Sequence, residues 1–426
     1  MIFVGFGFLL TSFHRFRLSS LTSCFWVAAL AVQYYFLFTS FWEGVIMGHF
    51  PSEININNTT LILGEVSAGA MLIAACAIIG KTNSLQFLII TIAGSFLYTL
   101  NETLVIVKLK ARDVGGAMII HAFGAFYGIG ITFMYKYSDA MNSKNLYETQ
   151  DSLTSAMVGT LFLWCFWPSF NAALGASPEE IHMATLNTYF SIIASCVMGY
   201  TTSMILGKGK YKMSQILNAT LAGGVVMGSC GDYLYDGWIA YLCGALIGVV
   251  SVLLFEYSPR LMDKFDIHDV AGVLNLHGIP GIIGGLLSAI FRAKYVDDNG
   301  GVQVAGVGIS VGIGLVGGLI VGALTKHLHH YEHNNRYFND LTNVALEEFV
   351  EAELEVYGGP HSNHTQAVTT VRGDHGSRAE LAPAQYNINQ HNYEMQPIAN
   401  LHIQTNPTLF IDQDEQLRIK NQDNLE

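Results

Sequence analysis

The chain has 426 residues, of which 51% are hydrophobic and 13% charged, and its formal net charge at pH 7 is −12. A soluble protein of this length needs charge spread over its surface, so the composition indicates a membrane protein. The acidic residues concentrate in the last hundred positions, which favours a solvated cytoplasmic tail over an acidic face for a cationic partner. No segment is basic enough to bind nucleic acid.

Cysteine and histidine usage predicts no disulfide framework, no metal site and no cofactor. The six cysteines lie mostly in apolar runs without a CxxC spacing, which indicates small core residues. A cluster of histidines follows the last apolar run, but without cysteine or ordered acids it is weak evidence for a metal tract: His327, His329, His330 and His333. No cleavable signal peptide is evident, since spanning segments follow residues 1–13 at once.

Apolar runs predict about eleven transmembrane helices and an all-α polytopic membrane protein. The runs lie near residues 1–14, 18–42, 61–80, 84–107, 113–135, 151–174, 183–206, 214–231, 235–256, 269–291 and 302–325. The first is too short to span a bilayer alone. We expect a transmembrane domain over residues 1–326 and a cytoplasmic tail over 327–426. The tail begins with an amphipathic stretch near 338–357 and continues in a Pro-, Gln- and Asn-rich segment that we expect to be mostly disordered.

Loop charges predict the orientation of the chain. One alternating set of loops carries eleven Lys and Arg residues, whereas the other set carries five. The positive-inside rule puts the first set and the tail in the cytoplasm, in a multi-pass protein of the plasma membrane. Loop 43–60 is then extracellular, and its overlapping acceptor triplets at Asn57 and Asn58 are candidate glycosylation sites.

Several residues on the predicted outer side are candidates for a pore mouth. Glu65 begins the third run, where its charge could attract a cation. Glu102, in the fourth run, either binds cations or pairs with a neighbouring group, and the sequence leaves both open. The sixth run ends with Phe166, Trp167 and Phe170, which form either an interfacial belt or a dry constriction that a hydrated ion cannot cross.

One phrase occurs twice, as Asp113-Val-Gly-Gly-Ala-Met-Ile-Ile-His121 and as Asp269-Val-Ala-Gly-Val-Leu-Asn-Leu-His277. The copies begin the fifth and tenth runs, so an odd number of crossings makes their helices antiparallel. Eight residues at about 1.5 Å rise place each histidine about 12 Å from its aspartate, near the middle of a hydrocarbon core about 30 Å thick. This is the inverted-repeat arrangement of a membrane permeation pathway.

The aspartates and histidines of this phrase have different predicted roles. Asp113 and Asp269 stand where helices begin, so we expect N-caps, and an ion-binding role for Asp113 stays open. His121 and His277 are ionisable groups at membrane depth, which makes them candidate pore-lining residues. Two adjacent neutral imidazoles can share a proton and present a polar wall to a small neutral molecule. Burial of two like charges disfavours protonation of both rings.

The phrase stands among longer motifs. These are Gly-Thr-Leu-Phe-Leu-Trp at 159–164, Phe-Trp-Pro-Ser-Phe-Asn at 166–171, Asn-Ala-Thr-Leu-Ala-Gly-Gly-Val at 218–225 and Asn-Leu-His-Gly-Ile-Pro-Gly-Ile-Ile-Gly-Gly at 275–285. Together they closely resemble the Rh (Rhesus) glycoprotein branch of the ammonium transporter superfamily. The resemblance covers residues 1 to about 326.

The resemblance implies a homotrimer in which each subunit has an inverted five-helix repeat and its own narrow hydrophobic pore. It implies that His121 and His277 line the pore, that the acid matching Asp113 supports an outer site, and that phenylalanines gate the outer mouth. Phe170 matches one of these two gate phenylalanines. Val66 stands at the position that matches the other, which predicts a wider outer constriction. Family members usually have twelve spanning helices, and the first is absent here.

These observations predict a membrane channel for ammonia and ammonium, not an enzyme. Ammonium is recruited at the outer vestibule, loses its proton and crosses as NH3, because an intact cation in a dry bore costs several kcal/mol. CO2 is a second candidate substrate on the resemblance alone. The alternative is a non-conducting scaffold whose tail anchors a cytoskeletal or adaptor protein, but such relatives lack the histidine pair. A membrane enzyme with two histidine haem ligands is a third hypothesis.

Overall fold

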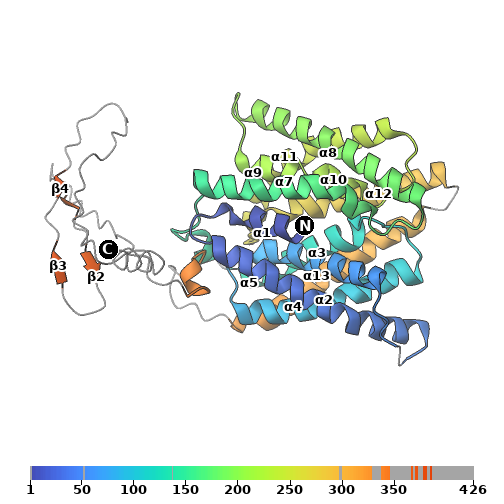
Figure 1. Ribbon diagram of the computed structural model, residues 1–426, viewed down its shortest axis with the longest axis horizontal. Coiled ribbons are helices and arrows are strands. Elements are labelled where there is room, and N and C mark those ends of the chain that lie inside the picture. Colours follow the sequence, from blue (N-terminus) through green and yellow to red (C-terminus); the bar gives the residue numbers. More distant parts are fainter. Residues whose placement is uncertain are drawn as a thin grey trace, which may run out of the picture. The chain divides into compact units, whose positions relative to one another are not determined.

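The computed structural model describes residues 2–50, 53–136, 138–296, 300–328 and 337–345, and four short strands further along the chain. Residues 1–346 form one compact unit and residues 347–426 a second. The first unit is a bundle of long helices that run side by side (Figure 1). Its helices are α1 (Ile2–Leu9), α2 (Arg17–Met47), α3 (Asn58–Ile78), α4 (Ser84–Glu102), α5 (Phe123–Tyr135), α6 (Ser138–Met141), α7 (Gln150–Ala172), α8 (Pro178–Leu206), α9 (Met213–Ala219), α10 (Ala222–Met227), α11 (Gly237–Met262), α12 (Ile279–Tyr295) and α13 (Gly301–Thr325).

Within the described residues, nine helical segments are long and apolar enough to cross a membrane, and two shorter apolar ones, Ile2–Ser12 and Met213–Met227, accompany them. Each predicted run corresponds to one of these segments, which confirms an all-α polytopic membrane fold. The boundaries differ in several places. The fifth and tenth helical segments begin at 117 and 274 instead of 113 and 269, and the predicted run 214–231 is broken between α9 and α10.

Local capping explains several helix boundaries. Asn57, Asn83 and Thr149 each cap the following helix, and each shares a reciprocal pair of hydrogen bonds with the residue three positions on. α2 continues past its predicted end at 42 and stops at Gly48. That glycine has a left-handed backbone (φ 82°), and its amide donates to the carbonyl of Gly44.

The two halves of the bundle pack in corresponding ways. In the first half, α2 packs on α3 and α4, and α3 packs on α5. In the second half, α8 packs on α10 and α11, and α10 packs on α12. This matched pattern is what an internal five-helix repeat requires. α13 stands outside the repeat and packs along α5 and α4.

Residues 337–345 pack against the loops at one end of the bundle. Phe338 is fully buried, its ring lies 5.1 Å from that of Phe13, and its amide donates to the carbonyl of Gly80 at 3.1 Å. The Asp340 carboxylate caps the start of α2 by accepting three backbone amide hydrogens, at 3.1, 3.1 and 2.7 Å. The donors are Arg17, Leu18 and Ser19. The predicted amphipathic stretch therefore begins as a docked segment.

The second unit contains two antiparallel strand pairs. β1 (Gln366–Ala367) pairs with β4 (Ala384–Gln385), and β2 (Thr370–Arg372) pairs with β3 (Arg378–Glu380). The rest of the predicted tail, including the expected disorder, lies outside the described residues.

Candidate functional site

The two copies of the repeated phrase adopt the same local structure. In each copy a glycine with a left-handed backbone follows the aspartate by three residues, and both Gly116 and Gly272 have φ 73°. Glycine adopts this conformation without steric cost, which explains its place in both copies. A short π-helical turn follows, Ala117–Ala122 in one copy and Leu274–Gly278 in the other, and it carries the histidine. Turns of this kind are frequent at functional sites.

Asp113 and Asp269 each cap the turn that carries the histidine. Asp113 accepts two backbone amide hydrogens, at 3.0 and 2.8 Å, and Asp269 accepts two, both at 2.9 Å. The donors are Met118, Ile119, Val273 and Leu274. Asp113 also accepts a hydrogen bond from the hydroxyl of Ser229. Because the caps satisfy the first free amides of each turn, they fix the position and rotation of the histidines.

The turns bring His121 and His277 together in the interior of the bundle. Their Nδ1 atoms are 3.0 Å apart, so one ring donates a hydrogen bond and the other accepts it. The rings are nearly parallel, at 10° with centroids 5.1 Å apart, and both residues are buried. Trp167 stacks beside them, with its ring centroid 5.6 Å from that of His121 and 6.4 Å from that of His277. The ring of Phe6, on α1, has its centroid 6.0 Å from that of His277.

One polar atom of this pair has no partner. His121 Nε2 is buried, and the described residues offer it no hydrogen bond. A cavity of about 10 Å³ lies beside it, lined by Ile2, Phe6, Gly69, Ile73, Ile120, His121, Leu163, Trp167 and Phe170. That volume is about the least that holds one water-sized molecule. Small polar solutes therefore fit the site one at a time.

This small cavity lies between two larger ones, and α1 runs along all three. Ile2 and Phe3 line a cavity of about 240 Å³, Ile2 and Phe6 line the small one, and Leu9 lines another of about 250 Å³. At about 1.5 Å rise per residue, Ile2 and Leu9 are separated by about 10 Å. The cavities thus follow one another along the helix axis. We refer to the first large cavity as the Asp113-end cavity and to the last as the Asp269-end cavity.

The Asp113-end cavity contains most of the predicted mouth residues. Glu65, Val66, Phe166 and Phe170 line it together with residues of α1 and α7. Val66 is buried, whereas Glu65 is exposed. Phe170 also lines the small cavity, and its ring lies 6.4 Å from His121, so it stands between the two spaces.

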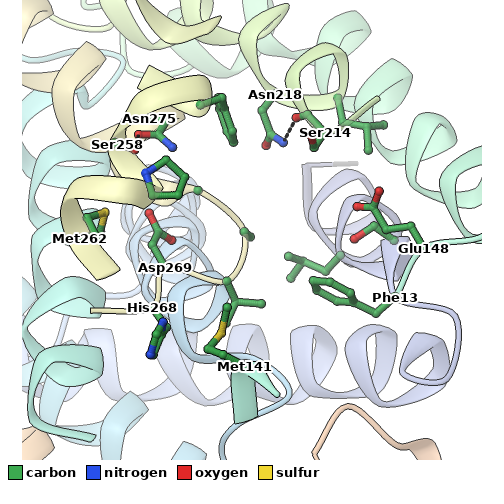
Figure 2. A pocket seen from close by; sticks show the side chains of 18 of the residues that line it. Phe13, Met141, Glu148, Ser214, Asn218, Ser258, Met262, His268, Asp269 and Asn275 are labelled. Atoms are coloured by element: carbon green, nitrogen blue, oxygen red, sulfur yellow. Dashed lines mark hydrogen bonds between the residues drawn. The ribbon is translucent and has the colours of Figure 1, made fainter. Parts of the chain in front are cut away.

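Several polar side chains line the Asp269-end cavity (Figure 2). Asp269 and Asn275 stand on one side of it, and Glu148 stands on the opposite side near Phe13. Burial raises the pKa of Glu148. Neither Glu148 nor Asn275 is predicted as a site residue from the sequence, although Asn275 lies inside the repeated phrase, two residues before His277.

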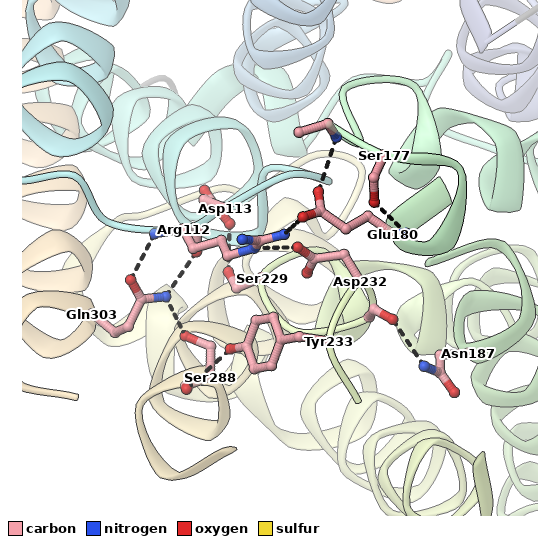
Figure 3. A network of polar contacts seen from close by, with 12 residues as sticks. Arg112, Asp113, Ser177, Glu180, Asn187, Ser229, Asp232, Tyr233, Ser288 and Gln303 are labelled. Atoms are coloured by element: carbon pink, nitrogen blue, oxygen red, sulfur yellow. Dashed lines mark hydrogen bonds and ion pairs between the residues drawn. The ribbon is translucent and has the colours of Figure 1, made fainter. Parts of the chain in front are cut away.

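A polar network holds the loop of Asp113 (Figure 3). Arg112 pairs with Glu180 at 2.7 Å and with Asp232, and its backbone exchanges two hydrogen bonds with the side chain of Gln303, at 2.8 and 2.7 Å. Burial opposes the charge of Arg112, but the two carboxylates outweigh it and raise its pKa. This network is not predictable from the sequence, which signals it only through a set of polar residues at the ends of apolar runs on one predicted side.

Glu102, Asn57 and Asn58 are not among the residues that line these three cavities. Glu102 is buried next to Tyr98, whose hydroxyl lies 3.5 Å from its carboxylate, and it is not among the residues that line the three cavities. Of the two sequence alternatives, this position favours pairing with a neighbouring group. Asn57 and Asn58 are exposed at the start of α3.

The chain is similar in sequence to known membrane proteins. A family model described as the Ammonium Transporter Family matches residues 1–333. The chain is 40% identical over 334 residues to the ammonium transporter Rh type A of Bos taurus, and the match covers 76% of each chain. It is 35% identical over 351 residues to the ammonium transporter Rh type B of Takifugu rubripes, again over 76% of each chain.

The fold is similar to solved structures. The Rh50 protein of Nitrosomonas europaea, from the Rhesus family of channels, matches with a TM-score of 0.73 and 30% identity, over 81% of this chain and 88% of that one. Mep2 of Candida albicans matches with a TM-score of 0.62 over 75% of this chain and 80% of that one, at 17% identity, which shows a shared fold alone.

Proposed function

This chain belongs to the Rh branch of the ammonium transporter family, and from that premise we propose that it conducts ammonia past His121 and His277. The observation that carries the proposal is the buried Nε2 of His121, which has no hydrogen-bond partner in the described part of the chain and lies beside a cavity of about 10 Å³. A buried polar atom left without a hydrogen bond costs about 1 to 3 kcal/mol, so a small polar solute is favoured there. Ammonia both donates and accepts hydrogen bonds and fits that volume.

Ammonium is recruited at the Asp113 end and crosses as neutral NH3. Glu65 lines the cavity at that end and attracts a cation, and Asp113 supports the same end. The cation releases its proton to solvent water in the Asp113-end cavity, before the small cavity, because an intact charge at membrane depth costs several kcal/mol. The neutral histidine pair then presents hydrogen-bonding atoms to ammonia without adding a charge.

Phe170 and Val66 form the gate at the Asp113 end. Both line the cavity there, and Phe170 also borders the small cavity next to His121. An apolar neck of this kind excludes hydrated ions by dewetting. Because valine is smaller than phenylalanine, this neck is wider than one built from two aromatic rings.

The Asp113 end faces the outside of the plasma membrane. The loops at the Asp269 end carry more Lys and Arg, which favours a cytoplasmic position for that end and for the tail. The exposed Asn57 and Asn58 are then extracellular and available for glycosylation. The assembly is a homotrimer with one pore in each subunit, and CO2 is a second substrate of the same pathway.

A non-conducting scaffold, with a tail that anchors a cytoskeletal or adaptor protein, is the alternative function. It needs no polar atoms in the interior beyond those that hold the fold. The contact between His121 and His277 and the adjoining cavity favour conduction, since a scaffold has no use for a polar site of this size.

Stopped-flow fluorimetry on proteoliposomes tests the proposal. The purified protein is reconstituted around an internal pH dye and mixed with an ammonium gradient, and we expect faster alkalinisation than in protein-free liposomes. The double variant His121→Ala/His277→Ala, reconstituted at equal density, is the matched control. Wild-type rates equal to those of protein-free liposomes would refute the channel and leave the scaffold.

A further inference from the structure

Lys81, in the loop between α3 and α4, is a buried lysine with no part in the proposed pathway. It is 1% exposed, and its Nζ donates to Thr132 Oγ1 at 2.7 Å and to the backbone oxygen of His268 at 2.6 Å. Among the described residues, no ion pair joins it to a carboxylate. A buried amine without an ion pair is costly, so stability alone does not explain its presence.

The oxygen that Lys81 holds belongs to the loop that places His277. Thr132, on α5, donates to the same oxygen at 2.8 Å, so the loop between α3 and α4 and the helix α5 together fix the backbone of His268. The next residue is Asp269, the cap of the turn that carries His277. Hydrogen bonds and two short stretches of backbone therefore connect Lys81 to the turn that carries His277.

The backbone next to Lys81 is held by a second set of contacts. Its neighbour Gly80 has a left-handed backbone (φ 74°), and its carbonyl accepts the amide hydrogen of Phe338 at 3.1 Å. The ring of Phe338 occupies the space that a Cβ on Gly80 would need. The backbone that bears Lys81 is thus fixed by the docked segment 337–345.

We propose that Lys81 is a positioning residue that holds the 266–273 loop and thereby fixes Asp269 and His277 in the pore. Its effect on transport rests on the proposed channel function. Its effect on the loop does not, because that effect follows from the hydrogen bonds alone.

The protonation of Lys81 gives this role a pH dependence. Burial lowers the pKa of Lys81 from 10.5 to about 7, and the carboxylate of Asp269 offsets this only in part. A neutral amine has two N–H donors, which match the oxygens of Thr132 and His268. The titratable groups that act on Lys81 are Asp269 and His268 of the loop, whereas α5 contributes the neutral Thr132 and Phe338 is apolar.

The sign of the pH effect follows from linkage. When the loop moves away, water reaches Lys81 and its pKa returns toward 10.5. Between pH 7 and that value, the closed loop therefore binds fewer protons than the open loop, and closure strengthens as the pH rises. Lowering the pH on this side of the membrane from 10.5 toward 7 therefore loosens the loop, and the effect is complete below about pH 7.

Amide hydrogen exchange in the full-length protein, read at Val273 and Leu274, tests the proposal. In Lys81→Met we expect exchange at these amides to be roughly tenfold faster, since a buried hydrogen bond is lost. In the wild type, protection corrected for the intrinsic rate should rise from pH 7 to pH 9, and the variant should lack this rise. Lys210→Met, at an exposed lysine on the same predicted side, is the control and should change neither.

Thr132→Val provides a second, milder variant in case Lys81→Met fails to fold. It removes one donor to the His268 oxygen and should speed exchange at the same amides by a smaller factor. The proposal is overturned if either folded variant leaves both the exchange rate and its pH profile unchanged. A wild-type protein that conducts no ammonia would refute the channel instead, because exchange reports on the loop directly.

Discussion

The Asp113 end and the Asp269 end of the pathway share a backbone plan but hold it with different side chains. Each end has a capping aspartate, a left-handed glycine and a π-helical turn with a histidine. At the Asp113 end, the residue before the aspartate is Arg112, which pairs with two carboxylates. At the other end it is His268, whose ring has no hydrogen-bond partner among the described residues, and Lys81 holds its backbone instead.

This difference separates what the repeat requires from what each membrane face requires. Both copies need the carboxylate and the glycine, because a tight turn with free amides must be capped in each. The neighbouring charges differ. At one end Arg112 pairs with Glu180 and Asp232, whereas at the other end Lys81 lies near Asp269. This asymmetry means that an ion network holds the loop at one end and hydrogen bonds from a buried amine hold it at the other.

The largest effect should come from breaking the ion network at the Asp113 end. Arg112→Met leaves the carboxylate of Asp232, 1% exposed, without its cation, and we expect a loss of about 3 kcal/mol in unfolding free energy, the low end for a broken buried pair. Arg112 itself is 32% exposed, so water recovers part of the loss. The matched change His268→Met should cost about 0.5 kcal/mol. Unfolding in detergent measures both, and equal losses would contradict the asymmetry.

The caps should show a smaller difference between the two ends. Asp113→Ala and Asp269→Ala should each cost about 0.5 to 2 kcal/mol in unfolding free energy, because each frees two amides. The loss should be greater for Asp113→Ala, since Ser229 also loses its acceptor. Asp113→Asn should be milder, because an amide oxygen still caps the turn. Ammonia flux and surface expression are both measured for each variant. If Asp113→Asn and Asp113→Ala both fold well and lose transport equally, the negative charge of Asp113, and not its capping, is needed for transport.

The histidine pair should affect transport more than folding. His121→Ala and His277→Ala should each lower ammonia permeability about two- to tenfold, as expected for the loss of a hydrogen bond worth about 0.5 to 1.5 kcal/mol. Subunit assembly should persist, because both rings are buried in the interior of the bundle and not on its surface. Proteoliposome flux and size-exclusion chromatography measure the two properties. Wild-type permeability to ammonia and methylammonium in both variants would rule out a pore lined by this pair.

The smallest effect should come from narrowing the gate at the Asp113 end. Val66→Phe adds a ring beside Phe170 in the cavity, so the flux of methylammonium should fall a few-fold more than that of ammonia. Phe170→Ala should act in the opposite direction and admit water or ions, because a dry neck depends on apolar side chains that meet. Liposome fluxes and electrical currents report these changes. An unaltered size selectivity in Val66→Phe would show that residue 66 does not border the pathway.

Much of the architecture is readable from the sequence because the bilayer imposes a one-dimensional rule. A segment either stays apolar for about 20 residues or leaves the membrane, so the eleven runs and their order follow from composition. The repeated phrase likewise predicts two antiparallel capped helices with a histidine at equal depth. Their boundaries shift to 117 and 274, since in each copy the chain must first pass a left-handed glycine.

The sequence by itself determined the membrane fold, the two capped turns and the candidate pair His121 and His277. Only the tertiary structure decided which atoms meet: the 3.0 Å contact between the rings, the pairing of Arg112 with Glu180 and Asp232, and the hold of Lys81 on His268. Spacing along one helix is set by a constant rise per residue. Contacts between residues far apart in the chain depend on how whole helices pack, and no local pattern encodes that packing.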